Sequence, residues 1–252
     1  MGKQAAMSKH ILTIILVFAV LCTLPVQGAM TTPSATPATK ASAAPTAAPA
    51  ASKSEAQFVA SVTKDLQSRF ATTAQATAGG YYRYTDEDDT GAISWVNTAN
   101  WKSDAQHPSQ LWYDLSGRLI GADFSVLQST SPKAPTIWGV SASRFIDFSP
   151  AHVHFGVNTP SGVQFGAVGP KTWSNVGDPM EHPTKADVVK LGTLPRWKLL
   201  KIPAPRTPAD VAFVFEFPAI WDLQVWLVPN PLGAFAEHNP NVKPSANAKS
   251  QD

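Results

Sequence analysis

The segment from Phe148 to Gly169 limits most strongly what this chain can fold into, because its apolar residues recur with a period of two. A cluster of turn-forming residues, 158–162, divides it into two alternating halves. Alternation on both sides of such a cluster is typical of a β-hairpin. We therefore expect a hairpin here, in a domain built largely from strands.

The two faces of the first strand of this hairpin differ in chemistry, because successive side chains of a strand point to opposite sides. The side chains expected on the apolar face are Ala151, Val153, Phe155 and Val157. The other face is expected to carry His152, His154 and Gly156. Two neighbouring imidazoles beside a glycine are the most chemically suggestive feature of the sequence.

The same alternation recurs before and after the hairpin, between short clusters of turn formers. Further strands are expected at 81–85, 92–98, 111–115, 118–127, 211–217 and 220–228. Pro218-Ala219 is interpreted as a tight reversal that pairs the last two of these strands. A bulge in one long strand is the alternative.

Two helices are expected among these strands. Ser52 and Glu55 fit a capping box, and apolar residues follow at helical spacing up to Phe70. A shorter helix is expected from Thr184 to Leu191, ended by Gly192. The predicted fold class is α+β: a mainly antiparallel, curved β-sheet built from hairpins, with an N-terminal amphipathic helix packed on it.

Composition divides the chain into four parts. Residues 1–28 have the charged, apolar and small-residue regions of a bacterial signal peptide. Residues 29–53, rich in Ala, Thr, Pro and Ser, are expected to form a disordered tether. Residues 54–242 are expected to fold as one globular domain, and 243–252 to form a disordered tail. The protein is therefore expected to be extracytoplasmic, either periplasmic or secreted.

Removal of the signal peptide also excludes some functions. The only cysteine is Cys22, so the mature chain would have no disulfide and no thiolate. The formal net charge of +2 would fall to zero, because Lys3 and Lys9 leave and no acidic residue does. A neutral chain without a basic cluster does not suit nucleic acid. No membrane-spanning segment is expected in the mature protein.

The paired histidines suggest a metal site as one hypothesis. Imidazoles two residues apart on a strand can converge on one ion, and zinc sites need at least a third protein ligand. His182 is the best candidate for that ligand. Zinc or copper bound by His152, His154 and His182 is therefore an alternative to a metal-free protein.

Other residues support different hypotheses. Trp95 and Trp112 are candidates for lining a ligand pocket together with His152 and His154, because indoles often line such pockets. Glu216 and Asp222 lie in apolar strands, where a carboxyl group can act as a general acid in a hydrolase.

No assembled catalytic motif accompanies these residues. The predicted function is therefore an exported, non-enzymatic binding module that holds a small or apolar ligand, or a partner protein, in the concavity of the curved sheet. The alternatives are a metalloprotein and a hydrolase.

Overall fold

The computed structural model describes residues 46–177 and 179–249, and in this part of the chain strands predominate over helices. The predicted signal peptide and most of the predicted tether lie outside the described residues. No helix in the described part is long and apolar enough to cross a membrane.

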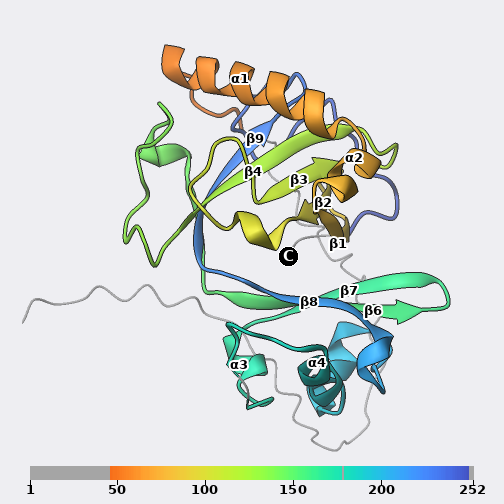
Figure 1. The fold of residues 1–252 in the computed structure, drawn as a ribbon. Coiled ribbons are helices and arrows are strands. Elements are labelled where there is room, and N and C mark those ends of the chain that lie inside the picture. Colours follow the sequence, from red (N-terminus) through yellow and green to blue (C-terminus); the bar gives the residue numbers. More distant parts are fainter. Residues whose placement is uncertain (1–45, 178, 250–252) are drawn as a thin grey trace, which may run out of the picture. The chain divides into compact units, whose positions relative to one another are not determined.

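The strands form two sheets, and every pair of neighbouring strands is antiparallel (Figure 1). The strands are β1 (Tyr82–Glu87), β2 (Ile93–Val96), β3 (Gln110–Tyr113), β4 (Leu119–Leu127), β5 (Ile146–Phe148), β6 (His152–Thr159), β7 (Gly162–Val168), β8 (Val211–Phe217) and β9 (Ile220–Trp226). One sheet has the order β1-β2-β3-β4-β9-β5, and the other has the order β7-β6-β8. The chain is therefore a β-rich α+β protein.

The described helices are few. The α-helices are α1 (Lys53–Phe70), α2 (Thr73–Ala78), α3 (Pro170–Trp173) and α4 (Lys185–Gly192). The short 3-10 helices are η1 (Thr98–Asn100), η2 (Ala142–Arg144), η3 (Pro195–Leu200) and η4 (Pro208–Asp210).

Helix α1 covers one face of the six-stranded sheet (Figure 1). Its apolar stripe, which includes Phe58, Val62 and Leu66, packs in one cluster with Phe124 of β4 and Leu223 of β9. Alternate residues of those strands face the other way, as the period of two requires. The six-stranded sheet therefore has one face under α1 and a second face turned toward the three-stranded sheet.

The start of α1 is fixed by a capping box and a buried ion pair. The Ser52 hydroxyl accepts from the Glu55 backbone N–H, and the Ser52 N–H donates to the Glu55 carboxylate at 2.8 Å. The Arg144 guanidinium also binds that carboxylate, with Nε 3.1 Å from Oε1. This guanidinium, opposed by burial, holds the pKa of Glu55 at about 2, below its usual 4.5.

A Glu55→Gln substitution is therefore expected to reduce the free energy of unfolding at pH 7 by about 1–3 kcal/mol. The lowered pKa makes this contribution complete above pH 4.5, and it is lost as the pH falls toward 2. Urea denaturation at pH 7 and at pH 3 measures both values. Glu237→Gln, at an exposed position, is the control. An equal effect of Glu55→Gln at both pH values would contradict the ion-pair explanation.

The hairpin predicted from the sequence forms the centre of the second sheet. β6 and β7 pair from Val153↔Val168 to Thr159↔Gly162 around a two-residue turn. The buried side chains of Val153, Phe155 and Val157 lie on the face of β6 that points away from the six-stranded sheet. They pack with α4, Trp173 and Trp197. The predicted separation of the two faces of β6 is therefore present in the structure.

The end of the domain differs from the sequence-based expectation, and so does the number of sheets. β8 pairs with β6 in the three-stranded sheet, whereas β9 pairs with β4 and β5 in the other. Pro218-Ala219 is thus neither a tight reversal nor a bulge, but the point where the chain passes from one sheet to the other. Because β8 joins the three-stranded sheet and β9 joins the six-stranded sheet, the domain has two sheets where the sequence predicted one.

Both ends of the described chain lie against the domain. Within the segment predicted to be a tether, the Ala48 N–H donates to the Leu232 carbonyl at 2.8 Å. In the predicted tail, the Ser245 N–H donates to Glu87 Oε1 at 2.8 Å, and the Lys249 N–H donates to the Glu87 carbonyl at 2.9 Å. These backbone hydrogen bonds, which composition cannot indicate, attach both segments to the domain.

Candidate functional site: an aromatic groove between the two sheets

The inner face of the three-stranded sheet carries a row of imidazoles beside a row of phenylalanines. Residues directly opposite each other in antiparallel strands share one face. The pairs are His152↔Phe217, His154↔Phe215 and Gly156↔Phe213. Phe165 of β7 lies opposite Gly156 on its other side. This face turns toward Tyr82 and Tyr84 of β1, which contact its rings.

The two histidines form a neutral hydrogen-bonded pair. His152 Nδ1 lies 3.2 Å from the Pro150 carbonyl, which can only accept, so the proton of a neutral His152 is on Nδ1. His152 Nε2 then accepts from His154 Nε2 at 3.0 Å. The His154 ring stacks on Phe215 with centroids 5.5 Å apart, and loss of hydration there lowers the pKa of His154 to about 3. Burial lowers the pKa of His152 as well, so burial favours the neutral form of both rings.

His182 does not join this pair. The His182 side chain is exposed, and its effect on Glu216 is to lower a pKa that burial and Glu181 raise. Glu216 is paired with Val153 on the outer face of the three-stranded sheet, opposite to His152 and His154. Among residues 46–177 and 179–249, no group of three His, Cys, Asp or Glu side chains is arranged to hold a metal ion. The described residues thus do not assemble the predicted zinc or copper site.

The two tryptophans proposed as pocket residues lie on opposite faces of the six-stranded sheet. Trp112 is paired with Ser94, whereas Trp95 is paired with Leu111, which packs in the cluster under α1. Trp112 is buried, and its Nε1 donates to Asp123 Oδ2 at 2.8 Å. Trp95 and Trp112 therefore cannot line one pocket; Trp112 is a core residue, and Trp95 is partly buried against the cluster under α1.

The carboxylates considered for a hydrolase are also separated. Asp222 is buried on the inner face of the six-stranded sheet, while Glu216 is on the outer face of the other sheet. Burial raises the pKa of Asp222 to about 7, and burial with the nearby Asp222 charge raises the pKa of Asp123 well above its usual value. No histidine pairs with either carboxyl group among the described ion pairs.

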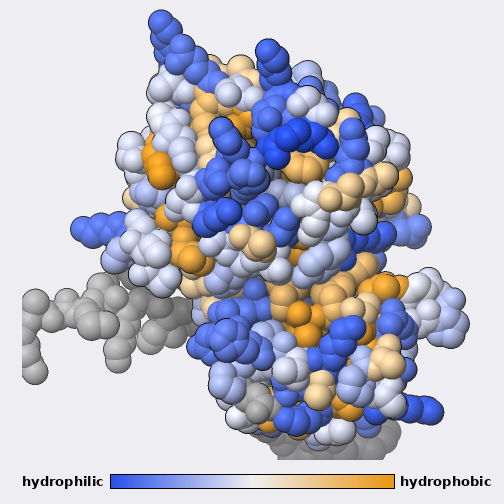
Figure 2. Space-filling model, in the orientation of Figure 1, coloured by the Kyte–Doolittle hydropathy of each residue, from blue (hydrophilic) through white to orange (hydrophobic). Residues whose placement is uncertain are grey.

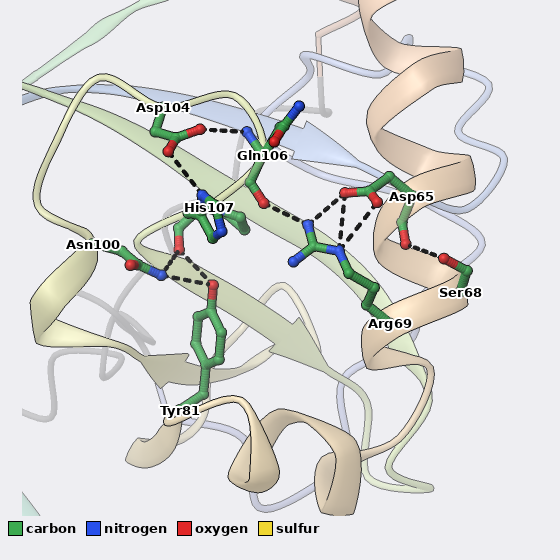
Figure 3. Close-up of polar contacts among 9 residues, drawn as sticks. Asp65, Ser68, Arg69, Tyr81, Asn100, Asp104, Gln106 and His107 are labelled. Carbon is green, nitrogen blue, oxygen red and sulfur yellow. Dashed lines mark hydrogen bonds and ion pairs between the residues drawn. The ribbon is translucent and has the colours of Figure 1, made fainter.

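A histidine–carboxylate contact does occur in the loop after η1, where His107 Nδ1 lies 2.7 Å from Asp104 Oδ2 (Figure 3). Asp104 also accepts from the Gln106 backbone N–H, and these two hydrogen bonds lower its pKa. Figure 3 shows that Arg69 of α1 binds the Gln106 carbonyl and Asp65. The cluster thus fastens this loop to α1, and it presents no nucleophile to His107 among the residues drawn.

A groove of about 680 Å³ opens beside the inner face, between β1 on one side and residues of β7 and β8 on the other. Its lining residues are Tyr82, Arg83, Asp86, Ser161, Gly162, Val163, Phe165, Ala212 and Phe213. Figure 2 shows apolar surface where β1 approaches β7 and β8. We call this opening the aromatic groove.

The floor of the aromatic groove is centred on the Phe213 ring, which contacts two other rings. The Phe213 centroid lies 6.0 Å from that of Phe165 and 5.3 Å from that of Tyr82. Gly156 lies beneath them, and a Cβ there would come within 2.6 Å of Phe213 and 2.7 Å of Val163. The absence of a side chain at Gly156 therefore leaves the space that Phe213 and Val163 occupy over β6.

A smaller cavity of about 410 Å³ opens at the other end of β6, next to His152. Phe148, the cis peptide Ser149-Pro150 and Ala167 also line it. Ala167 and Phe165 are two residues apart on β7, so the groove and the cavity open along the same strand. The histidine pair thus lies between two openings, and both of its side chains are partly exposed.

Comparisons with protein-family models, with curated proteins and with solved structures found no match to the chain.

Sequence reasoning located the sheet face but not the groove on it. His152 and His154 share a face with Phe165 and Phe213 but do not line the groove, and the groove residues Tyr82, Arg83 and Phe213 come from strands more than 50 positions away. The alternation in the second half of the hairpin does place Val163 and Phe165 on the histidine face. Those two positions were the available signal for an apolar surface beside Gly156.

Proposed function

We propose that this protein is a non-enzymatic binding module whose aromatic groove holds a small ligand with a flat apolar body. The single observation that carries the proposal is the ring floor, in which Phe213 contacts Tyr82 and Phe165, half-buried along an opening of about 680 Å³. Openings of this size lined by aromatic side chains and a few polar groups are typical of small-molecule sites.

The proposal changes the location of the site expected from the sequence. The ligand was expected in the concavity of one curved sheet; the groove instead lies where two sheets meet. The proposed ligand is still a small apolar molecule, and a partner protein bound in the same groove is the alternative. We also propose that the module acts outside the cytoplasm. This proposed location rests on the signal-peptide pattern of residues 1–28.

The two alternatives have less support. A metalloprotein would need a third ligand beside His152 and His154, and no group of three His, Cys, Asp or Glu side chains is arranged for an ion among residues 46–177 and 179–249. A hydrolase would need a carboxyl group and a histidine that reach one substrate, whereas Asp222 and Glu216 face different parts of the domain.

A Phe213→Ala substitution is expected to weaken the binding of phenylnaphthylamine, a neutral aromatic probe that fluoresces in apolar sites, by about tenfold. Loss of one stacked ring and its buried area corresponds to roughly 1.4 kcal/mol. Fluorescence titration of the mature protein measures the dissociation constant.

Phe148→Ala is the matched control, because Phe148 is an exposed aromatic residue that lines the smaller cavity instead. It should leave probe affinity unchanged. Phe165→Ala tests the same floor by a second route, and circular dichroism verifies that each variant folds. Equal loss in Phe148→Ala, or no loss in either groove variant, would disprove the proposed site.

A further inference from the structure

We infer that the ligand of the aromatic groove carries an anionic group, and that Arg83 binds it. The inference rests on the proposed function, since it concerns the same groove, and it adds the chemical class of the ligand: a flat apolar body with a carboxylate or a similar oxyanion. It starts from the position of the guanidinium.

Arg83 lies at the edge of the ring floor. Its guanidinium carbon is 5.1 Å from the centroid of Phe165, a cation–π arrangement. The side chain is 40% exposed and lines the groove. A ligand ring placed on Phe165 and Phe213 would therefore have a fixed cation beside it.

Most of the hydrogen-bonding capacity of Arg83 remains available. Nε donates to the Thr85 carbonyl at 2.7 Å, and Nη2 donates to Asp86 Oδ1 at 3.2 Å. Nη1 has no partner among the described residues. A guanidinium has five N–H donors in one plane, a geometry that matches two oxygens of one carboxylate. The two hydrogen bonds hold the guanidinium in place and use only two of its five N–H donors.

Asp86 does not neutralise Arg83 completely. It is the only acidic residue among those lining the groove, and its carboxylate is shared by two cations: Oδ1 accepts from Arg83, and Oδ2 accepts from Lys249 Nζ. Arg83 therefore has only a share of the Asp86 charge. Because Phe165 covers one side of the guanidinium, the charge of Arg83 is less hydrated than that of a fully exposed arginine, which strengthens its interaction with an anion.

The test uses two probes that differ only by an anionic group: phenylnaphthylamine and anilinonaphthalene sulfonate. Wild-type protein is expected to bind the sulfonate at least fivefold more tightly than the neutral amine at low salt, and the preference should shrink as salt is added. Arg83→Met, which keeps most of the length of the side chain, should weaken binding of the sulfonate probe by about tenfold or more. It should change the affinity for the neutral probe by less than twofold. Arg83→Lys should restore part of the preference.

Arg118→Met is the matched control, because Arg118 is likewise an exposed arginine paired with a nearby aspartate, but lies outside the groove. It should change neither affinity. Equal weakening of both probes by Arg83→Met, or no preference for the sulfonate in the wild type, would overturn the inference while leaving the groove intact. Binding of both probes that is insensitive to Phe213→Ala would instead overturn the proposed function itself.

Discussion

An Asp222→Asn substitution is expected to raise the free energy of unfolding at pH 8 by roughly 2–4 kcal/mol relative to wild type, and to raise it much less at pH 4. Asp222 and Asp123 lie on the same inner face of neighbouring strands, and both are at most 3% exposed. Oδ1 of each has no hydrogen-bond partner, and neither has an ion-pair partner among the described residues. Ionisation of this pair inside the protein is therefore costly.

The sign of the effect follows from the direction of the pKa shift. Burial raises the pKa of Asp222 from 3.8 to about 7, so between these values the folded protein binds more protons than the unfolded chain. The stabilising contribution of the neutral carboxyl is complete below pH 3.8 and is lost as the pH rises through 7. Asparagine is uncharged throughout, so the variant should not show this loss.

Urea denaturation at intervals from pH 4 to pH 8 measures the effect. His154 contributes a slope of the opposite sign, because its lowered pKa makes the folded protein lose stability as the pH falls below 6.5. Because His154 is present in both proteins, its contribution cancels in the difference between their free energies of unfolding. That difference therefore reports the Asp222 carboxyl group. Asp89→Asn, at an exposed position in the turn after β1, is the control and should change little. A pH-independent difference for Asp222→Asn would show that the pair is not ionising in this range.

Local features of the fold were predictable because short-range interactions determine them. The capping boxes at Ser52 and Thr184 involve residues three positions apart, and both are present. The β6–β7 hairpin follows from alternation around a turn within 16 residues. In each case the sequence contains both partners within one short segment.

Strand partners that are distant in sequence were not predictable. β4 pairs with β9 about 100 positions later, and nothing in either strand specifies the other. Pro218-Ala219 is compatible with a reversal, a bulge or a passage between sheets, since proline only removes a donor and fixes φ. Which of these occurs depends on the apolar faces that β8 and β9 bury, and those faces exist only after folding.

The same limit applies to the candidate site. Alternation assigned His152 and His154 to one face of β6, and the structure agrees. Alternation within one strand does not indicate which of its faces lies beside a given face of the next strand. Trp95 and Trp112 were therefore both predicted to line one pocket, whereas the register Ser94↔Trp112 puts them on opposite sides of the sheet. Tyr82, Arg83 and Phe213 become a site only because the two sheets meet.

A Phe215→Ala substitution is expected to reduce the free energy of unfolding by about 3–5 kcal/mol, the usual cost of emptying a buried aromatic site. Phe215 is 6% exposed and lies between the sheets. Its ring contacts those of Tyr82 and Tyr84 on one sheet and those of His154 and Phe213 on the other. No other inner-face phenylalanine has ring contacts with both of these tyrosines among the described residues, so its loss should weaken the packing of one sheet on the other.

Denaturant melts at constant pH measure this effect, with Phe148→Ala as the control for loss of a phenylalanine at an exposed position, where a change below ~1.5 kcal/mol is expected. A loss below ~1 kcal/mol for Phe215→Ala would mean that the two sheets do not depend on this ring. It would also remove support for the groove, since Phe213 and Tyr82, which form its floor, are held in place by contacts with Phe215. The stability of the inter-sheet core and the shape of the aromatic groove are therefore expected to change together.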